Sequence, residues 1–181
     1  MSTNYLLWIG AIVVAYLVFM YGLRHLLAKK PAEAVTDLTA DEAMKQYLGR
    51  VAPEIDPAHF RLLWGSTFAN TDITRIYAYN AERICVIPAK VAQGELVMPV
   101  DQPAATIELR EVDHIWFGRK DSLLRMLSVD LFFGPEDDDN RFQIWCEKKD
   151  VCGNDNRPEF RKFIDFLDAW AKQHNIPTED L

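Results

Sequence analysis

The chain has 181 residues and a net charge of −7 at neutral pH, from 27 acidic and 20 basic side chains. Arg24, Lys29 and Lys30 are its first three basic residues and no acidic residue precedes them, so residues 31–181 carry a net charge of −10. This acidic balance argues against nucleic-acid binding and against a general attraction to anionic lipids.

Residues 5–28 predict one membrane-spanning helix, because about 20 apolar residues cross the roughly 30 Å hydrocarbon core of a bilayer. No charged residue precedes Arg24, and Tyr5, Trp8 and Tyr21 lie where aromatic rings meet the membrane interfaces. A secretory signal peptide would carry positive charge before its apolar run, and a buried core helix would be shorter. We therefore expect a membrane anchor.

The flanking charges predict its orientation. Arg24, Lys29 and Lys30 follow the span and nothing basic precedes it, so the positive-inside rule puts residues 1–4 outside and the remainder in the cytoplasm. The chain would then be a single-pass protein of the inner (cytoplasmic) membrane. Within the span, Ala11 and Ala15 have the small-xxx-small spacing that allows packing on another helix.

A juxtamembrane linker with one short helix is expected over residues 29–58. Thr39 and Glu42 have capping-box spacing, which predicts a helix from there through Leu48, with Gly49 as its C-terminal signal. The apolar residues of this helix share one face, so it should rest on the domain or on the membrane surface.

Strands dominate the middle of the chain. The pair Asp56-Pro57 begins either a further helical turn or a stretch leading to a first strand near Trp64. Beyond residue 71, apolar residues alternate in short runs separated by turn residues, which predicts β-hairpins. Pro88 should end the second run, and Pro99 marks the third as an edge or a strand end. The predicted strands are 75–79, 83–87, 95–100, 106–109, 112–117, 123–133 and 141–147.

The last element is an amphipathic helix with Pro158 in its first turn and Pro177 beyond its end. Its apolar residues recur at helical spacing and must be buried against the preceding sheet. They are Phe160, Phe163, Ile164, Leu167, and Trp170 or Ala171. Strands followed by one terminal helix predict an α+β fold.

Three segments resemble bacterial pleckstrin-homology-like (PH-like) domains. The hairpin Tyr79-Asn80-Ala81-Glu82-Arg83-Ile84, the strand and turn over residues 106–112, and the closing helix from Phe160 to Trp170 are similar to elements of that family. The likeness covers roughly residues 68–174. It implies a bent antiparallel sheet closed by a C-terminal helix, with residues 59–176 as the cytoplasmic domain and 177–181 as a tail. Such domains are often fused to membrane helices.

No catalytic or metal-binding pattern is evident. Cys146 and Cys152, even with His114, lack the second close pair of ligands typical of structural zinc sites. Cys85 or Ser66 could be imagined as a nucleophile, but neither lies in a nucleophile-elbow or catalytic-cysteine signature. We expect no catalytic residue, no metal and no cofactor.

Two groups of residues are candidates for contact with lipid or with a partner. The first is a basic cluster near a turn between strands, where PH-like domains can meet headgroups. It comprises Arg110, Arg119, Lys120 and Arg125. The second is the pair Trp64 and Phe117, for which core packing is the default and exposure would mark a partner surface.

Three functions remain open. The leading hypothesis is a non-enzymatic adaptor or accessory subunit, anchored in the membrane, whose PH-like domain binds a membrane-associated protein. The alternative is a sensor of anionic lipid headgroups that uses the basic cluster. A membrane-tethered hydrolase or metalloenzyme is the least favoured of the three.

Overall fold

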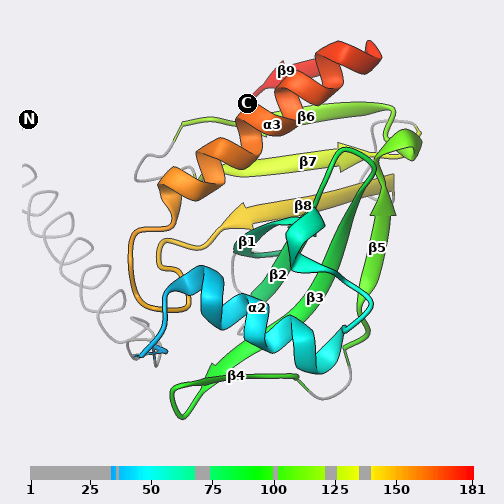
Figure 1. The fold of residues 1–181 in the computed structure, drawn as a ribbon. Coiled ribbons are helices and arrows are strands. Elements are labelled where there is room, and N and C mark those ends of the chain that lie inside the picture. The colour runs from blue at the N-terminus through cyan, green and yellow to red at the C-terminus, as the bar shows by residue number, and fades with distance from the viewer. Residues whose placement is uncertain (1–33, 36, 68–73, 100–101, 121–125, 135–139) are drawn as a thin grey trace, which may run out of the picture. The chain divides into compact units, whose positions relative to one another are not determined.

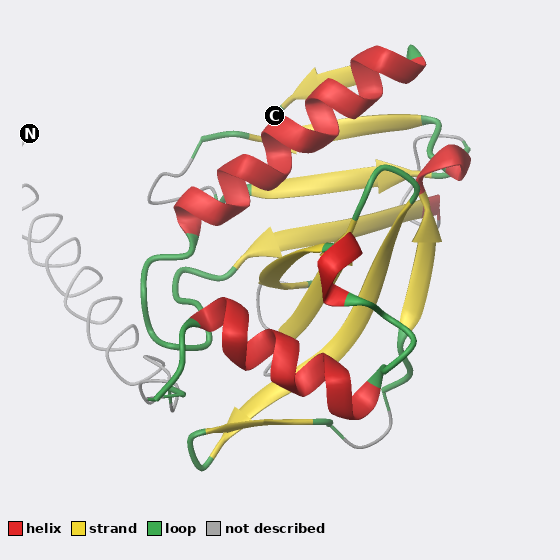
Figure 2. Cartoon of the chain, viewed as in Figure 1, coloured by secondary structure: helices red, strands yellow, loops and turns green. Residues whose placement is uncertain are grey.

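Nine strands in one sheet and two α-helices make up most of the described chain, which confirms the predicted α+β class (Figures 1 and 2). The computed structural model describes residues 34–35, 37–67, 74–99, 102–120, 126–134 and 140–181. All of them belong to one unit, Glu33–Leu181, and Met1–Ala32 is a second unit. The predicted membrane span at residues 5–28, with Ala11 and Ala15, lies outside the described residues. Among the helices that are described, none has the length and apolar character needed to span a membrane.

The elements follow the predicted order, with strands in the middle and a long helix near the end. The strands are β1 (Arg61–Ser66), β2 (Thr74–Tyr79), β3 (Arg83–Ala92), β4 (Glu95–Val97), β5 (Ala105–Glu108), β6 (His114–Gly118), β7 (Ser128–Phe132), β8 (Arg141–Cys146) and β9 (Thr178–Asp180). The helices are α2 (Ala40–Val51) and α3 (Arg157–His174), with 3₁₀ turns η1 (Pro57–His59) and η2 (Leu109–Glu111). The Asp56-Pro57 pair therefore starts a short helical turn, and a strand follows it.

The strand order is β4-β3-β2-β1-β8-β7-β6-β9, and β5 pairs with β3 beside this path. Neighbouring strands are antiparallel except β6 and β9, which are parallel. Strands β1 and β8 share only two register pairs, Gly65 with Cys146 and Ser66 with Trp145. We therefore distinguish a first part of the sheet, β1–β5, from a second part, β6–β9, which meet at this narrow join.

The main hydrophobic core joins both parts of the sheet to α3. Tyr77 from β2, Phe117 from β6 and Ile144 from β8 meet Phe163 of α3, and all four side chains are fully buried. Every residue of the predicted helical stripe is buried in this core, which confirms that prediction. Figure 1 shows α3 lying along the strands of the second part. The indole nitrogen of Trp170 also donates to the Ala81 carbonyl at 2.9 Å, tying the end of α3 to the β2–β3 turn.

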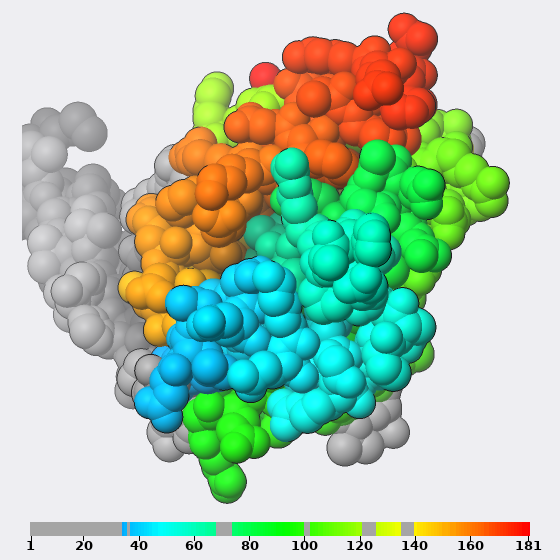
Figure 3. Space-filling view, viewed as in Figure 1, coloured from blue at the N-terminus to red at the C-terminus, as the bar shows by residue number. Residues whose placement is uncertain are grey.

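A second core lies on the other face of the first part, beneath α2. Tyr47 and Leu48 of α2 pack with Trp64 of β1 and Ile76 of β2. In Figure 3, α2 (blue to cyan) and α3 (orange to red) cover much of the face turned to the viewer. The short helix was expected to rest either on the domain or on the membrane surface. In the structure, it packs against the domain.

Helix α2 begins where the sequence predicted and ends later than predicted. The capping box is present, since Thr39 Oγ1 accepts from the Glu42 amide and Glu42 Oε2 accepts from the Thr39 amide. The predicted stop at Gly49 is wrong, because the helix continues to Val51. Its end coincides with Pro53 two residues later, which cannot continue a helix.

The prediction that Pro88 ends a strand is also wrong, since β3 runs through it. Strand β5 pairs with Arg83–Val86 of β3, and β4 pairs with Lys90–Ala92, so Pro88 lies in the gap between them. A residue without an amide hydrogen is tolerated there because no described strand pairs with that stretch of the β3 edge. Its carbonyl accepts a hydrogen bond from the Tyr47 hydroxyl at 2.6 Å.

The two end strands of the sheet, β4 and β9, are held by different contacts. At one end, the Arg50 guanidinium of α2 donates to the Leu96 carbonyl of β4 at 3.0 Å, which occupies an acceptor on that edge strand. At the other end, the chain turns at Asn175, which has a left-handed φ of 56°, and forms β9 beside β6. The sequence predicted only a tail there.

A buried amide fixes the join between the two parts. Asn156 Nδ2 donates to the carbonyl of Trp64 at 2.7 Å and to the carbonyl of Glu147 at 3.1 Å. Asn156 is only 3 % exposed and immediately precedes α3. One side chain therefore holds β1, the segment after β8 and the start of α3 together.

Candidate functional site

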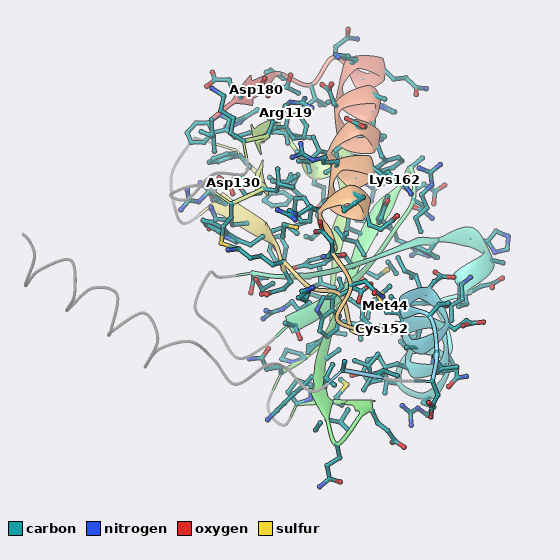
Figure 4. All side chains as sticks on the ribbon, turned by 90° about the vertical axis from the view of Figure 1, so that its left-hand side faces the viewer. Met44, Arg119, Asp130, Cys152, Lys162 and Asp180 are labelled. Atoms are coloured by element: carbon teal, nitrogen blue, oxygen red, sulfur yellow. The ribbon has the colours of Figure 1, made fainter. Side chains whose placement is uncertain are left out.

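One face of the second part of the sheet carries aromatic and polar side chains. Trp116 of β6 lies opposite Asp130 of β7, which lies opposite Gln143 of β8. Residues in register project to the same face of a sheet, so the rows on either side extend this set. We call it the outer face: His114, Trp116, Ser128, Asp130, Phe132, Arg141, Gln143 and Trp145. In Figure 4, Asp130 lies on the opposite side of the sheet from Lys162 of α3.

The aromatic rings of the outer face pack on one another. The His114 ring stacks on Phe132, with centroids 4.2 Å apart, and Trp116 meets Phe132 edge-on at 4.7 Å. Phe132 is only 2 % exposed, whereas Trp116 and Trp145 are half-buried. Among the described residues, Phe132, Trp116 and Trp145 belong to neither hydrophobic core. The outer face is therefore a separate aromatic layer on the far side of the sheet from α3.

Asp130 is a buried carboxylate at the centre of this layer. Its side chain is 2 % exposed, and Oδ2 lies 3.9 Å from Nη1 of Arg141. Burial raises the pKa of Asp130 because the charged form loses its hydration, while a hydrogen bond with Gln143 and the positive charge of Arg141 act in the opposite direction. The carboxylate is thus held in an apolar, aromatic environment with one cation near it.

Four buried polar atoms on this face, or next to it across the β1–β8 join, have no hydrogen-bond partner among the described residues. They are Ser66 Oγ, Trp116 Nε1, Asp130 Oδ1 and Trp145 Nε1. Ser66 lies directly opposite Trp145 in register, so its side chain extends the same face. Each unpaired buried group costs about 1–3 kcal/mol, and folded proteins keep few of them. Three donors and one acceptor gathered on one face make it the strongest candidate site, although each of these atoms is buried in the free chain.

The predicted basic cluster is not a free cationic patch. Arg119 forms ion pairs with Asp180 at 2.6 Å and Asp168 at 3.2 Å, and it lies 4.0 Å from Asp165. Its guanidinium also stacks over the ring of Phe117, 4.6 Å from the centroid. The structure thus places Arg119 in a contact between β6, α3 and β9.

The other three members of that cluster do not join Arg119 in one described site. Arg110 lies in η2 and Lys120 follows β6, and both are exposed. Arg125 lies outside the described residues. The structure therefore places one of the four residues in a network of carboxylates and two on the surface.

Trp64 and Phe117, the two aromatic residues considered as a partner surface, are buried. Trp64 is 5 % exposed beneath α2, and Phe117 is fully buried in the main core. The idea that they form an exposed surface is therefore corrected. The physical reason is strand alternation, which turns Phe117 toward α3 and leaves its neighbour Trp116 on the outer face.

Cys146 and Cys152 lie in different surroundings. Cys146 is buried in the main core, and Cys152 Sγ contacts the Leu38 carbonyl at 3.0 Å. Burial raises the pKa of the Cys152 thiol and of the Cys85 thiol, which opposes formation of the reactive thiolate. Within the described ranges, no three His, Cys, Asp or Glu side chains are grouped to hold a metal ion.

An open groove of about 480 Å³ lies between α2 and the β3–β4 turn. Its lining includes the apolar residues Val35, Leu38 and Leu96 and the charged residues Asp37, Arg50 and Glu95. The described lining residues include no His, Cys or Ser, so they offer no nucleophile with a base. The outer face remains the stronger candidate.

Comparison with known proteins gave no match to a protein-family model, to a curated protein or to a solved structure. The fold therefore defines the class of the protein, which is α+β. The candidate site is defined by the register, ring contacts and burial of the outer-face residues.

The residues that define the outer face were partly visible in the sequence. Trp116 and Trp145 are large side chains within the predicted strands 112–117 and 141–147, whereas no pattern pointed to Asp130 or Gln143. Only the pairing of β6, β7 and β8 brings these four residues together, and that register was not predicted. A usable signal was the polar residue in the middle of each apolar strand, where alternation leaves Asp130 and Gln143 on the face opposite the core.

Proposed function

We propose that the protein is a non-enzymatic, single-pass membrane adaptor whose PH-like domain binds a membrane-associated protein partner. The long apolar segment at residues 5–28 supports the anchor. A mainly antiparallel sheet with α3 packed against it in the main core supports the PH-like assignment, together with the sequence resemblance. The basic residues after the apolar segment support a cytoplasmic position for the domain.

The observation that carries this proposal is the set of unpartnered buried polar atoms on the outer face. An enzyme of this size would be expected to group a nucleophile, a base or metal ligands in a cleft, whereas the outer face groups indole donors and a carboxylate on a sheet. Aromatic side chains beside a few polar groups are typical of the centre of protein–protein interfaces.

The chemistry of the outer face defines the partner that it would bind. Asp130 offers an acceptor in an apolar setting, so a Lys or Arg side chain is the complementary group. Trp116 and Trp145 flank it with half-buried rings, over which such a cation can lie. The net charge of −10 beyond residue 30 would attract a basic partner from a distance. The partner would therefore present a cationic side chain in a basic surface.

The anchor would contribute by restricting diffusion. A domain held at the bilayer meets a membrane-bound partner at a higher effective concentration than a free domain would, so weak contacts on the outer face could suffice. The mechanism is tethering, and it requires no catalytic residue.

Purification of the full-length chain in mild detergent, with identification of co-purifying proteins, tests the proposal. The substitutions Asp130→Asn and Trp116→Ala should each reduce the recovered partner at least tenfold. Lys162→Ala is the matched control, because Lys162 is exposed on α3 across the sheet and should change nothing. Equal recovery from all four proteins would exclude the outer face as the binding surface.

The anchor is tested separately by extraction of membranes. The full-length chain should stay with the membrane in high salt and dissolve only in detergent, and release by salt alone would remove the anchor from the proposal. External protease on intact cells should leave residues beyond Lys30 uncut.

Lipid sensing is the competing function, and Arg119 argues against it. Two close carboxylates, from Asp180 and Asp168, already neutralise its guanidinium, so it has little charge left for a headgroup. Binding of a fluorescent, soluble anionic-lipid analogue to the full-length protein in detergent would separate the two functions. Binding that depends on Arg110 and Lys120 would favour lipid.

A further inference from the structure

Strand β9 covers the edge of β6 without contributing to either core. It has three residues, Thr178–Asp180, and all three side chains are exposed. It runs parallel to β6, with Thr178 opposite Ile115 and Asp180 opposite Phe117. A strand that buries none of its side chains is held mainly by its backbone, so it contributes little to the hydrophobic stabilisation of the fold.

The contacts that hold β9 are few and specific. The Ile115 amide donates to the Pro177 carbonyl at 3.0 Å, and the Leu181 amide donates to the Phe117 carbonyl at 2.9 Å. Within the described part of the chain, a side-chain hydrogen bond between β9 and the rest of the domain joins Arg119 Nε to Asp180 Oδ1 at 2.6 Å. The recognition chemistry is thus an extended backbone with a carboxylate at one position.

The site that receives β9 is held in place by other elements. Ile115 and Phe117 are fully buried in the main core, which fixes β6. Arg119 keeps its ion pair with Asp168 of α3 and its position over the Phe117 ring, and neither contact involves β9. The edge of β6 and the guanidinium would therefore stay in position if β9 left.

We propose that the β6 edge, together with Arg119, binds an extended acidic segment of a partner protein. In the free chain, β9 occupies this site in place of the partner. Two features of the site favour this occupant. Unpaired backbone groups on an edge strand bind another extended segment, and Arg119 selects one with a carboxylate two residues beyond the position paired with Ile115. This inference does not rest on the membrane anchor or on the outer face.

Exchange is feasible because the covering strand is short. Removing β9 breaks a three-residue ladder and one partly exposed ion pair, and exposed ion pairs stabilise a fold only weakly. The partner must nevertheless compete with a segment tethered at about millimolar effective concentration. Binding should therefore be much tighter once β9 is released.

The test uses the full-length chain in detergent, ended after Pro177, and a fluorescent peptide with the sequence of residues 174–181. The shortened chain should bind the peptide at least tenfold more tightly than the complete chain does. Adding Arg119→Gln to the shortened chain, or replacing the Asp in the peptide with Lys, should weaken binding about tenfold. Lys162→Ala in the shortened chain is the control and should bind normally.

A second variant covers the case in which the shortened chain fails to fold. Glu179→Pro in the complete chain removes a backbone donor from the middle of β9 and should release it while leaving the rest intact. It should gain peptide binding to a similar extent. Folded protein that binds no peptide, or peptide binding that is indifferent to charge at Arg119, would overturn the proposal. Concentration-dependent dimers of Glu179→Pro would show that the site binds a second copy of the chain. Unfolding of both variants would show that β9 is needed for the fold. Either result would also overturn the proposal.

Discussion

The two parts of the sheet differ in how they are covered. In the first part, β2 and β3 are buried on both faces, by the main core on one side and by α2 on the other. In the second part, the inner face meets α3, whereas no described residue of either core covers the outer face. The outer-face residues of β7 are nevertheless buried, so the two parts differ in what lies on this face: an apolar core in the first part, and a layer of aromatic and polar side chains in the second.

Composition follows this difference. Strands β2 and β3 read TRIYAY and RICVIPAKVA, with nearly continuous apolar residues, which is typical of strands buried on both faces. Strands β7 and β8 read SVDLF and RFQIWC, with a polar residue in the middle of each. Those interruptions, Asp130 and Gln143, lie where the function is proposed.

The largest expected effect comes from the core that both parts share. Phe163→Ala removes a fully buried ring from the centre of α3 and should lower the free energy of unfolding by about 3–5 kcal/mol. Denaturant unfolding of the full-length chain in detergent, monitored by tryptophan fluorescence, measures it. A loss below about 1 kcal/mol would show that α3 does not hold the two parts together.

The second prediction compares a substitution in α2, which covers the first part, with a substitution on the outer face of the second part. Leu48→Ala in α2 should cost about 2–5 kcal/mol, because it opens a cavity over the doubly covered part. Trp116→Ala on the outer face should cost less despite removing a larger side chain, because Trp116 is half-buried and outside both cores. Equal losses would mean that the outer face is a structural core.

The join between the parts has an intermediate effect. Asn156→Ala leaves the carbonyls of Trp64 and Glu147 without their donor and should cost about 1–3 kcal/mol. Hydrogen exchange should then show faster opening of β1 and β8 than of β2 and β3. Uniform acceleration across the sheet would contradict a local role for this amide.

The smallest effect, and one of opposite sign, concerns Asp130. Its pKa is raised above the ordinary 3.8, so the folded state holds a proton at pH values where the unfolded state has lost it. The free energy of unfolding should therefore fall as pH rises from about 3.8 through the raised pKa, and stay level above it. Asp130→Asn should flatten this dependence and leave stability at pH 7 equal or slightly higher. The parent should be less stable at pH 7 than at pH 4. If Asp130→Asn showed the same difference, Asp130 would not be the group that causes it.

The sequence predicted the parts of the fold that depend on local signals. Each of these signals comes from residues that are close together in the sequence. They are the capping box at Thr39, the hairpin between β2 and β3, and the apolar stripe of α3. Pro88 and Gly49 were misread because pairing with β4 and β5, and packing of α2 on the sheet, overrode their usual preferences.

The candidate site could not be predicted in the same way. Asp130 and Trp116 are brought together by strand register, and Arg119 and Asp180 by a strand that forms at the end of the chain. Trp64 and Phe117 were considered for the surface because hydrophobicity alone does not say which face of a strand is covered. Long-range pairing decides all three cases.

The contact between Arg50 and the Leu96 carbonyl has a consequence for crowded copies of this chain. A sheet with an open edge can grow by adding strands from neighbouring molecules, which is the first step toward insoluble fibres. A guanidinium on the β4 acceptor obstructs that growth at one end, and β9 obstructs it at the other. Loss of Arg50 should therefore show itself less in unfolding than in slow precipitation at high protein concentration.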